Sequence, residues 1–366
     1  MSGLRRLVVA SLIVLLILLT VRNDLALVRK PHLGVDIEIP LRAADRWLAG
    51  GQPYQAQAFI TGSGATLPFL YPPVVLPLFA VLSWLPRTPV LLGAFAVMLV
   101  AAVVAARRLR IPWLWIPLAL LWRPFFEGIV HTNLTILTFL AFIVLFYRRT
   151  GSPWRADPRD VSRPDESVVE VGALATVIGA VKVSQPHAWL FVLHYRWRAA
   201  AIGALAVVAL VLLTLPLTGN QPWFDWLDQL RRAGNPAWTA GGFGLPRYLP
   251  PLVASAIALA CIFAIWFVPR QEGGPWVGIL STVGAVSLHQ FGLLFLIPGM
   301  LMIRLEIALV AACLIATHSG RGAWAGIILI TAAYACSRFA PIRFRAWLRD
   351  WPALETPVAD GPPITT

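Results

Sequence analysis

Long apolar stretches constrain this chain more than any other feature of its sequence. Several of them approach the roughly 20 residues that an α-helix needs to cross the hydrocarbon of a bilayer. These stretches are Leu7–Val21, Pro89–Ala106, Ala199–Leu217, Leu252–Val268 and Ala323–Ala335. Only 13% of the residues are charged, whereas soluble domains carry about 25%. The sequence therefore predicts an all-α polytopic integral membrane protein with about ten transmembrane helices.

The arginines give the predicted orientation. The formal net charge is +13, and Lys30 and Lys182 are the only lysines among 30 basic residues. Basic proteins include nucleic-acid binders, but here the arginines form short clusters between apolar runs, which is the positive-inside pattern. We expect a plasma-membrane protein with a cytoplasmic N-terminus and no nucleic-acid partner. The segments expected on the cytoplasmic side are Met1–Arg6, Arg148–Arg163, Arg196–Arg198, Arg270 and Arg338–Arg349.

The loops follow from this orientation. The first apolar run is followed by Arg22, Asn23 and Asp24 rather than by a small-residue cleavage site, so an uncleaved helix is expected rather than a signal peptide. The chain reads as one transmembrane domain, followed by a proline-rich tail that is expected to be disordered. Its parts are the domain 1–350, the first external loop 23–69, the cytoplasmic linker 151–166, the external loop 219–246 and the tail 351–366.

One basic cluster does not fit simple alternation of spans. Two crossings before Arg107–Arg110 would place this cluster outside. A re-entrant or broken segment between Phe69 and Asn133 removes the conflict.

The first external loop is too long for a plain connector. Pro40 suits the first position of a helix, and Gly50 follows the last apolar residue, which suits a helix end. The pattern predicts a short amphipathic helix along the membrane surface, with Leu41, Ala44 and Leu48 on its apolar face.

Two carboxylates, Asp36 and Glu38, precede this predicted helix. Asp36 either caps or solvates the helix, or serves as a general base that takes a proton from an attacking hydroxyl. Further along, Tyr71-Pro72-Pro73 leads into an apolar run. A double proline is suited to start a helix, because its missing N–H groups fall where no helical acceptor exists.

Other polar residues lie close to predicted spans. Lys182 is followed by Ser184 and Gln185 in an otherwise apolar region; it either snorkels to the interface or serves a site, since ionisable groups at this depth are functional candidates. Asn133, just after His131, is either a helix cap or a site residue. His289 interrupts the apolar run from Trp276 to Met302, as a core histidine or as a site residue.

Several classes of protein are excluded by missing motifs. There is no P-loop, dinucleotide fingerprint or nucleophile elbow, which argues against an ATP-driven pump or a hydrolase. The three cysteines stand singly in apolar runs without metal-ligand spacing. We expect no cofactor and no metal site.

Taken in order, these residues resemble a known family. Asp36, Ala43-Ala44, Leu48-Ala49-Gly50, Pro53-Tyr54 and Tyr71-Pro72-Pro73 are similar to glycosyltransferase family 87 of the GT-C superfamily, and the similarity continues through Asn133, Lys182–Pro186, Tyr195–Arg198 and Ser287–His289. This family includes the PimE-like mannosyltransferases that use polyprenyl-phosphate-mannose. The chain departs from the family pattern at Val130-His131 and around His289.

The resemblance implies a GT-C type bundle and an inverting sugar transfer on the external face, with Asp36 as the base. It implies donor or phosphate contacts from Lys182, His289, Gln185 and Asn133, and secondary or acceptor roles for Glu38, Tyr71 and His131. The implied partners are a polyprenyl-phosphate-linked sugar, a glycolipid or lipid-anchored glycan acceptor, and membrane lipids. Mannose is expected ahead of arabinofuranose.

Two other classes of function stay open at this point. One is a lipid or glycolipid transporter, although such proteins commonly show internal repeats and none is found here. The other is an inactive relative that acts as a scaffold in envelope assembly.

Overall fold

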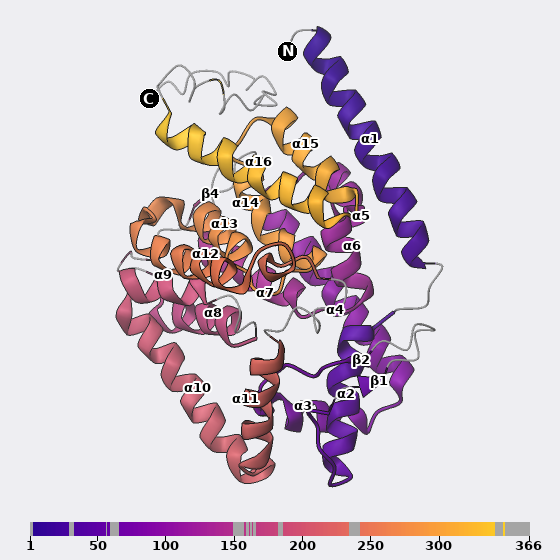
Figure 1. The fold of residues 1–366 in the computed structure, drawn as a ribbon, viewed down its shortest axis with the longest axis vertical. Coiled ribbons are helices and arrows are strands. Elements are labelled where there is room, and N and C mark those ends of the chain that lie inside the picture. The colour runs from indigo at the N-terminus through magenta and orange to yellow at the C-terminus, as the bar shows by residue number, and fades with distance from the viewer. Residues whose placement is uncertain are drawn as a thin grey trace, which may run out of the picture.

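The computed structural model describes residues 3–28, 33–55, 57–58, 66–148, 157–158, 161, 163, 166–181, 186–233, 242–340 and 347. Helices make up nearly all of the regular structure in this part of the chain (Figure 1). The helices that are long and apolar enough to cross a membrane are α1 (Gly3–Val28), α4 (Arg87–Arg108), α10 (Trp197–Thr218) and α16 (Gly320–Phe339). The prediction of a polytopic helical membrane protein is confirmed.

The remaining helices are shorter. Apolar helices of 10–17 residues occur among them, so length and composition assign four spans in the described residues rather than about ten. The α-helices are α2 (Val35–Leu48), α3 (Leu76–Ser83), α5 (Ile116–Leu121), α6 (Arg123–Val130), α7 (Thr135–Phe146), α8 (Val168–Val181), α9 (His187–Tyr195), α11 (Gln221–Ala233), α12 (Pro251–Ala264), α13 (Gly273–Val283), α14 (Ile297–Met300) and α15 (Leu305–Ala316). The 3₁₀ helices are η1 (Pro73–Val75), η2 (Trp113–Trp115), η4 (Leu245–Arg247), η5 (Ile265–Phe267), η6 (Arg270–Glu272) and η7 (Gln290–Leu296).

Two pairs of short antiparallel strands complete the described structure. In the segment 23–69, β1 (Gln57–Ala58) pairs with β2 (Thr66–Leu67). After α7, β3 (Tyr147–Arg148) pairs with β4 (Asp157–Pro158), which belongs to the predicted linker 151–166. Most of that linker and the predicted tail 351–366 lie outside the described residues. The predicted loop 219–246 is not a plain loop, because α11 occupies its first half.

The segment 23–69, predicted to be the first external loop, contains the short amphipathic helix α2, but two details of the prediction are wrong. The helix begins at Val35 rather than at Pro40, which lies inside it. Leu41 and Ala44 are fully buried, whereas Leu48 is 47% exposed. The apolar face instead includes Ile37, one helical turn before Leu41. Consequently Asp36 and Glu38 lie in the first turn of α2 and not ahead of it.

Between Phe69 and Asn133 the continuous helix α4 has short helices on either side of it, which agrees with a broken segment in this range. Pro73 starts η1, and α3 after it has only eight residues. Between α5 and α6 the helical conformation is interrupted at Trp122, whose ψ of 129° is not helical. Pro124 follows at the second position of α6, where a missing N–H costs no helical hydrogen bond.

Aromatic rings from four elements form the centre of the core. Phe139 and Phe142 of α7 pack at 5.8 and 5.1 Å from the ring of Phe295 in η7. Phe125 of α6 packs at 5.8 Å from Phe139, and Phe191 of α9 packs at 5.4 Å from Phe146. These buried pairs fix α6, α7, α9 and η7 relative to one another.

The arginine clusters gather at one end of the bundle. Arg108, at the end of α4, donates a hydrogen bond of 3.2 Å to the carbonyl of Tyr147, which follows the end of α7. Tyr147 lines one cavity together with Glu272 and Arg338, and the last two form an ion pair of 3.1 Å. The cluster at Arg107–Arg110 therefore lies with the other basic clusters.

Two more arginines lie at the same end. Arg270 adjoins Glu272 in η6 and places its guanidinium 5.1 Å from the ring centre of Tyr195. Arg196 is the next residue after Tyr195. We call this end of the molecule the basic end; its arginines are Arg108, Arg196, Arg270 and Arg338.

A buried ion network holds α1 against α6. Arg123 pairs with Glu127 at 2.8 Å, four residues on, as expected for a helix. It also lies 3.6 Å from Asp24 of α1 and donates to the carbonyl of Asn23 at 3.0 Å. Arg123 and Asp24 are each only 5% exposed.

Replacing Arg123 by methionine should strongly destabilise the protein, by about 3–5 kcal/mol, because two buried carboxylates lose their cation. Thermal unfolding of the purified protein in detergent measures this effect. Arg87→Met is the matched control, since Arg87 pairs with Asp45 where both side chains are about one-third or more exposed; such a pair contributes about 0–1 kcal/mol. Equal loss in both variants would contradict a stabilising role of the network.

Candidate active site

The candidate site begins at the end of α6. After His131 the chain reverses at Thr132, which has a φ of 55° and is fully buried. The N–H of Thr132 donates to the carbonyl of Ile129 at 3.0 Å, and the N–H of Asn133 donates to the carbonyl of Gly128 at 2.8 Å. This is the Schellman arrangement, in which the left-handed position is usually glycine. A β-branched residue there is strained, and such strain clusters at functional sites.

The start of α2 lies against this end of α6. The N–H of Gly34 donates to the carbonyl of Val130 at 2.9 Å, and the N–H of Asp36 donates to the carbonyl of His131 at 3.0 Å. The first N–H groups of one helix thus pair with the last carbonyls of another, where neither has a partner within its own helix. Gly34 has a φ of 76°, and a methyl group on it would lie 2.6 Å from Leu91.

This junction brings Asp36 and Asn133 together. The Asn133 side-chain amide donates a hydrogen bond of 2.7 Å from Nδ2 to Oδ2 of Asp36. The amide oxygen accepts from the backbone N–H of Thr135 at 2.8 Å, so the two ends of the amide have different partners. Asn133 therefore caps the start of α7 and also contacts Asp36. The capping contact that the sequence predicts for Asn133 is observed, and its role in a site stays a prediction.

Glu38 and His131 occupy different positions around Asp36. Glu38 accepts a hydrogen bond of 2.9 Å from Arg42, four residues on in α2. His131 contributes its backbone carbonyl to the junction, where it accepts from Asp36 and, at 2.6 Å, from the hydroxyl of Thr132. Glu38 is therefore paired within its own helix, whereas the Asp36 side chain is bound from another element by Asn133.

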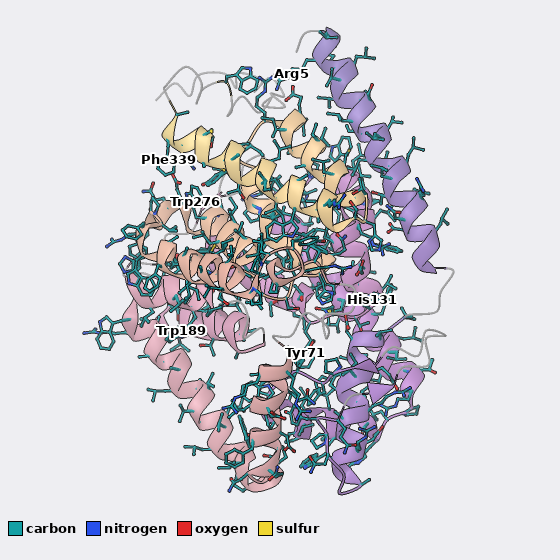
Figure 2. The ribbon with its side chains drawn as sticks, in the orientation of Figure 1. Arg5, Tyr71, His131, Trp189, Trp276 and Phe339 are labelled. Carbon is teal, nitrogen blue, oxygen red and sulfur yellow. The ribbon has the colours of Figure 1, made fainter. Side chains whose placement is uncertain are left out.

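Tyr71 lies in the electrostatic range of Asp36. Burial raises the pKa of the Tyr71 phenol, and the Asp36 carboxylate raises it further. Tyr71 therefore keeps its proton at neutral pH and can donate it in a hydrogen bond. In Figure 2, Tyr71 and His131 lie nearer to α2 and α11 than Arg5 and Phe339 do. Arg5 and Phe339 lie toward the opposite end of the molecule.

Helix α11 holds the segment that carries Tyr71. The indole of Trp226 donates to the carbonyl of Leu70 at 3.0 Å, and Gln229 donates to the carbonyl of Tyr54. The Tyr54 hydroxyl in turn donates to the carbonyl of Tyr71 at 2.8 Å. Trp226 and Gln229 are three residues apart, so they lie on one face of α11.

His289 lies at the end of the bundle opposite the basic end. Helix α13 starts at the basic end beside Tyr147 and finishes at Val283, shortly before His289. The His289 ring stacks on Phe291 at 5.4 Å. Phe291 in turn packs on α6, since a methyl group on Gly128 would lie 3.3 Å from its Cβ. This contact connects η7 to the helix end that binds Asp36.

Two of the predicted donor-binding residues, Lys182 and Gln185, lie outside the described residues. The next described helix begins with His187, a residue the sequence reading missed because it lies in an apolar run. His187 is 1% exposed, and neither ring nitrogen has a hydrogen-bond partner in the described part of the chain. A methyl group on Gly284, at the end of α13, would lie 3.4 Å from its Nε2.

Gly128→Ala should disturb the site through packing. The added methyl group would lie 2.8 Å from Ile136 and 3.3 Å from Phe291, and overpacking of this kind typically costs about 1–3 kcal/mol. We expect a lower unfolding temperature and weaker sugar transfer. Gly93→Ala in α4 is the control, because nothing lies within 4 Å of the added methyl group. A Gly128→Ala protein that matches this control would show that the α6–η7 contact tolerates change.

The two ends of the molecule are well separated. Helix α7 runs from Thr135, beside Asn133, to Phe146, beside Tyr147 at the basic end. Its 12 residues span about 18 Å at the usual rise per residue. The site is therefore displaced from the basic end by most of the thickness of a hydrocarbon core.

Comparison with known proteins identifies one family. The sequence profile of glycosyltransferase family 87 matches residues 69–296, more than half of the chain. This region contains Tyr71, Asn133 and His289 and begins after Asp36 and Glu38. No curated protein and no solved structure matches the chain.

Proposed function

The chain belongs to glycosyltransferase family 87, and from this premise we propose that it moves a sugar, mannose first, from a polyprenyl-phosphate donor to a lipid- or polysaccharide-linked acceptor. Family membership makes it a membrane glycosyltransferase in general terms. The donor, the sugar and the roles of individual residues are our proposal.

The hydrogen bond from Asn133 to Asp36 carries the proposal. It fixes one carboxylate oxygen, Oδ2, at 2.7 Å from Nδ2, while the backbone of Asp36 is fixed by the carbonyl of His131. Both the amide donor and the start of α2 stabilise a negative charge on Asp36. A carboxylate that is held in place in this way suits a general base.

In the proposed reaction, the acceptor hydroxyl gives its proton to Asp36 as its oxygen attacks the anomeric carbon of the donor sugar. A new C–O bond forms on the face opposite the phosphate, and the bond between the anomeric carbon and the phosphate oxygen breaks. Polyprenyl phosphate leaves with the electron pair, and the anomeric configuration inverts. No nucleotide is required, because the lipid phosphate is the leaving group.

The departing phosphate needs cationic or hydrogen-bonding partners. We propose Lys182, Gln185 and His289 for this role. His289 lies at the same end of the bundle as Asp36. Lys182 and Gln185 lie in the stretch of sequence shortly before α9. Asn133 is a positioning residue in this scheme. Tyr71, His131 and Glu38 are proposed to border the acceptor side of Asp36.

The positive-inside rule supports an orientation. With the basic end toward the cytoplasm, Asp36 faces the external side, and the N-terminus with Arg5 lies inside, where Arg5 pairs with Glu306. In this orientation, we propose that the transfer takes place on the outer face of the plasma membrane.

The test is direct transfer by the purified full-length protein. It is incubated with a glycolipid pool and with labelled polyprenyl-phosphate-mannose, polyprenyl-phosphate-arabinofuranose or nucleotide-linked mannose. We expect label in the glycolipid fraction from the mannosyl lipid donor and none from the nucleotide sugar. Lipid donors that stay intact with every acceptor would overturn the proposal and favour transport or scaffolding.

A further inference from the structure

Thr132 has a backbone conformation that is unusual for its residue type. In the described part of the chain, the residues other than glycine with a positive φ are Arg110 at 63°, Thr132 at 55° and His318 at 57°. Among these three, Thr132 is the β-branched residue and the one that is fully buried. A positive φ is an outlier for a β-branched residue, and it persists only where the surrounding structure holds it.

The end of α4 makes the same turn far from the site. The N–H groups of Arg110 and Ile111 donate, at 3.1 and 3.0 Å, to the carbonyls three and five residues earlier. Thr132 and the residue after it make the same two bonds at the end of α6. Because Arg110 completes this turn while partly exposed, the turn itself requires neither a threonine nor burial.

The hydroxyl of Thr132 gives the residue a second connection. It donates a hydrogen bond of 2.6 Å to the carbonyl of His131. The same carbonyl accepts the backbone N–H of Asp36 at 3.0 Å. A carbonyl oxygen has two lone pairs, so these two donors together fix its direction. The strained residue is therefore connected to the backbone of Asp36 through one carbonyl.

The next residue holds the side chain of Asp36. Asn133 donates to Oδ2 of Asp36 at 2.7 Å, and its own amide oxygen accepts from the N–H of Thr135. Consecutive residues of one turn thus hold the backbone and the carboxylate of Asp36. Such precision matters in an active site, since a displacement of about 1 Å can cost about 100-fold in rate.

We propose that Thr132 is a positioning residue, which fixes the backbone of Asp36 through the carbonyl of His131 and so sets the carboxylate toward the acceptor hydroxyl. Glycine would adopt the same φ without strain, but it would remove one of the two donors and let the turn move more freely. The role in catalysis rests on Asp36 as the base of the proposed reaction. The effect on the backbone of Asp36 does not, because it can be measured without sugar transfer.

Three substitutions of Thr132 in the full-length protein test this role. Thr132→Val keeps the branched shape and removes the hydroxyl, Thr132→Ser keeps the hydroxyl, and Thr132→Gly removes both hydroxyl and strain. Sugar transfer gives kcat and the KM for donor, and hydrogen exchange reports local opening at the backbone amide of Asp36. In Thr132→Val we expect kcat to fall about tenfold with an unchanged KM for donor, and the Asp36 amide to exchange faster. Thr132→Gly should lose at least as much, and Thr132→Ser should restore most of both properties.

Arg110→Gly is the matched control, because it changes the same turn at the basic end. This variant should show normal kcat and normal exchange at Asp36. Exchange in Thr132→Val and Thr132→Gly that equals the control would overturn the proposal, whether or not the protein transfers sugar. So would faster exchange with an unchanged kcat, or a Thr132→Ser protein that loses as much as Thr132→Val. A natural protein that transfers no sugar would contradict the proposed function instead, and the exchange rates would still decide whether Thr132 fixes Asp36.

Discussion

Replacing Asp36 by asparagine is expected to lower sugar transfer by about 10³-fold, within the usual contribution of a general base, while the amount of folded protein stays normal. Asparagine has nearly the same shape, and its amide oxygen can still accept the hydrogen bond that Asn133 donates to Oδ2. What it loses is the ability to take a proton from the acceptor hydroxyl. The measurement is the initial rate of labelled sugar transfer at saturating donor.

Glu38→Gln is the matched control for this prediction. Glu38 is two residues away in the same helical turn and pairs with Arg42 on a partly exposed face, where an ion pair contributes about 0–1 kcal/mol. Because Glu38 is proposed to border the acceptor without taking its proton, we expect a much smaller loss of transfer than in Asp36→Asn. Full activity in Asp36→Asn would remove Asp36 as the base, and loss of activity only in Glu38→Gln would reassign that role to Glu38.

Local sequence patterns predicted those helices whose positions depend on neighbouring residues alone. The apolar runs gave the long helices, and the proline pair before Val74 gave a helix start. The start of α2 was misjudged because Pro40 satisfies the rule for a first helical position. The helix begins five residues earlier, since its first N–H groups find acceptors on α6 rather than within the segment itself.

The site depended on contacts that no local pattern contains. Asp36 and Asn133 are 97 residues apart, and they meet because backbone N–H groups at the start of α2 donate to carbonyls at the end of α6. The sequence marked Asn133 as a candidate by type and position. It could not indicate the strained φ of Thr132 that aims Asn133 at α2, because that conformation is held by the surrounding structure.

Charge patterns predicted where the arginine clusters lie, but not every ion pair of the structure. The arginine clusters predicted one common end, and contacts through Tyr147 and Arg338 bring them there. The spacing of four residues on one helix accounts for the pair formed by Arg123 and Glu127. Spacing does not account for Asp24 as the third member, because an ion pair between α1 and α6 depends on how these helices pack.

The second large effect is expected from Asn133→Asp. Aspartate keeps the oxygen that accepts from the N–H of Thr135, so the start of α7 should be preserved, but it replaces the donor 2.7 Å from Oδ2 of Asp36 with a second carboxylate oxygen. Two carboxylates this close share one proton, and a proton on Asp36 blocks a general base. We therefore expect at least about a tenfold loss of transfer at pH 7, with the rising limb of the pH–rate profile moved to higher pH.

Asn133→Ala separates this electrostatic effect from loss of structure. Alanine removes both the cap and the donor, so transfer should fall, but without a second titrating group the rising limb should move far less than in Asn133→Asp. Thr135→Val is a further variant to measure. It removes a hydroxyl that also donates to the Asn133 amide oxygen, and it leaves the hydrogen bond from Asn133 to Asp36 in place. If Asn133→Asp and Asn133→Ala lose activity equally and neither shifts the profile, Asn133 supports the fold of the α6–α7 turn, and the hydrogen bond to Asp36 has no part in proton transfer.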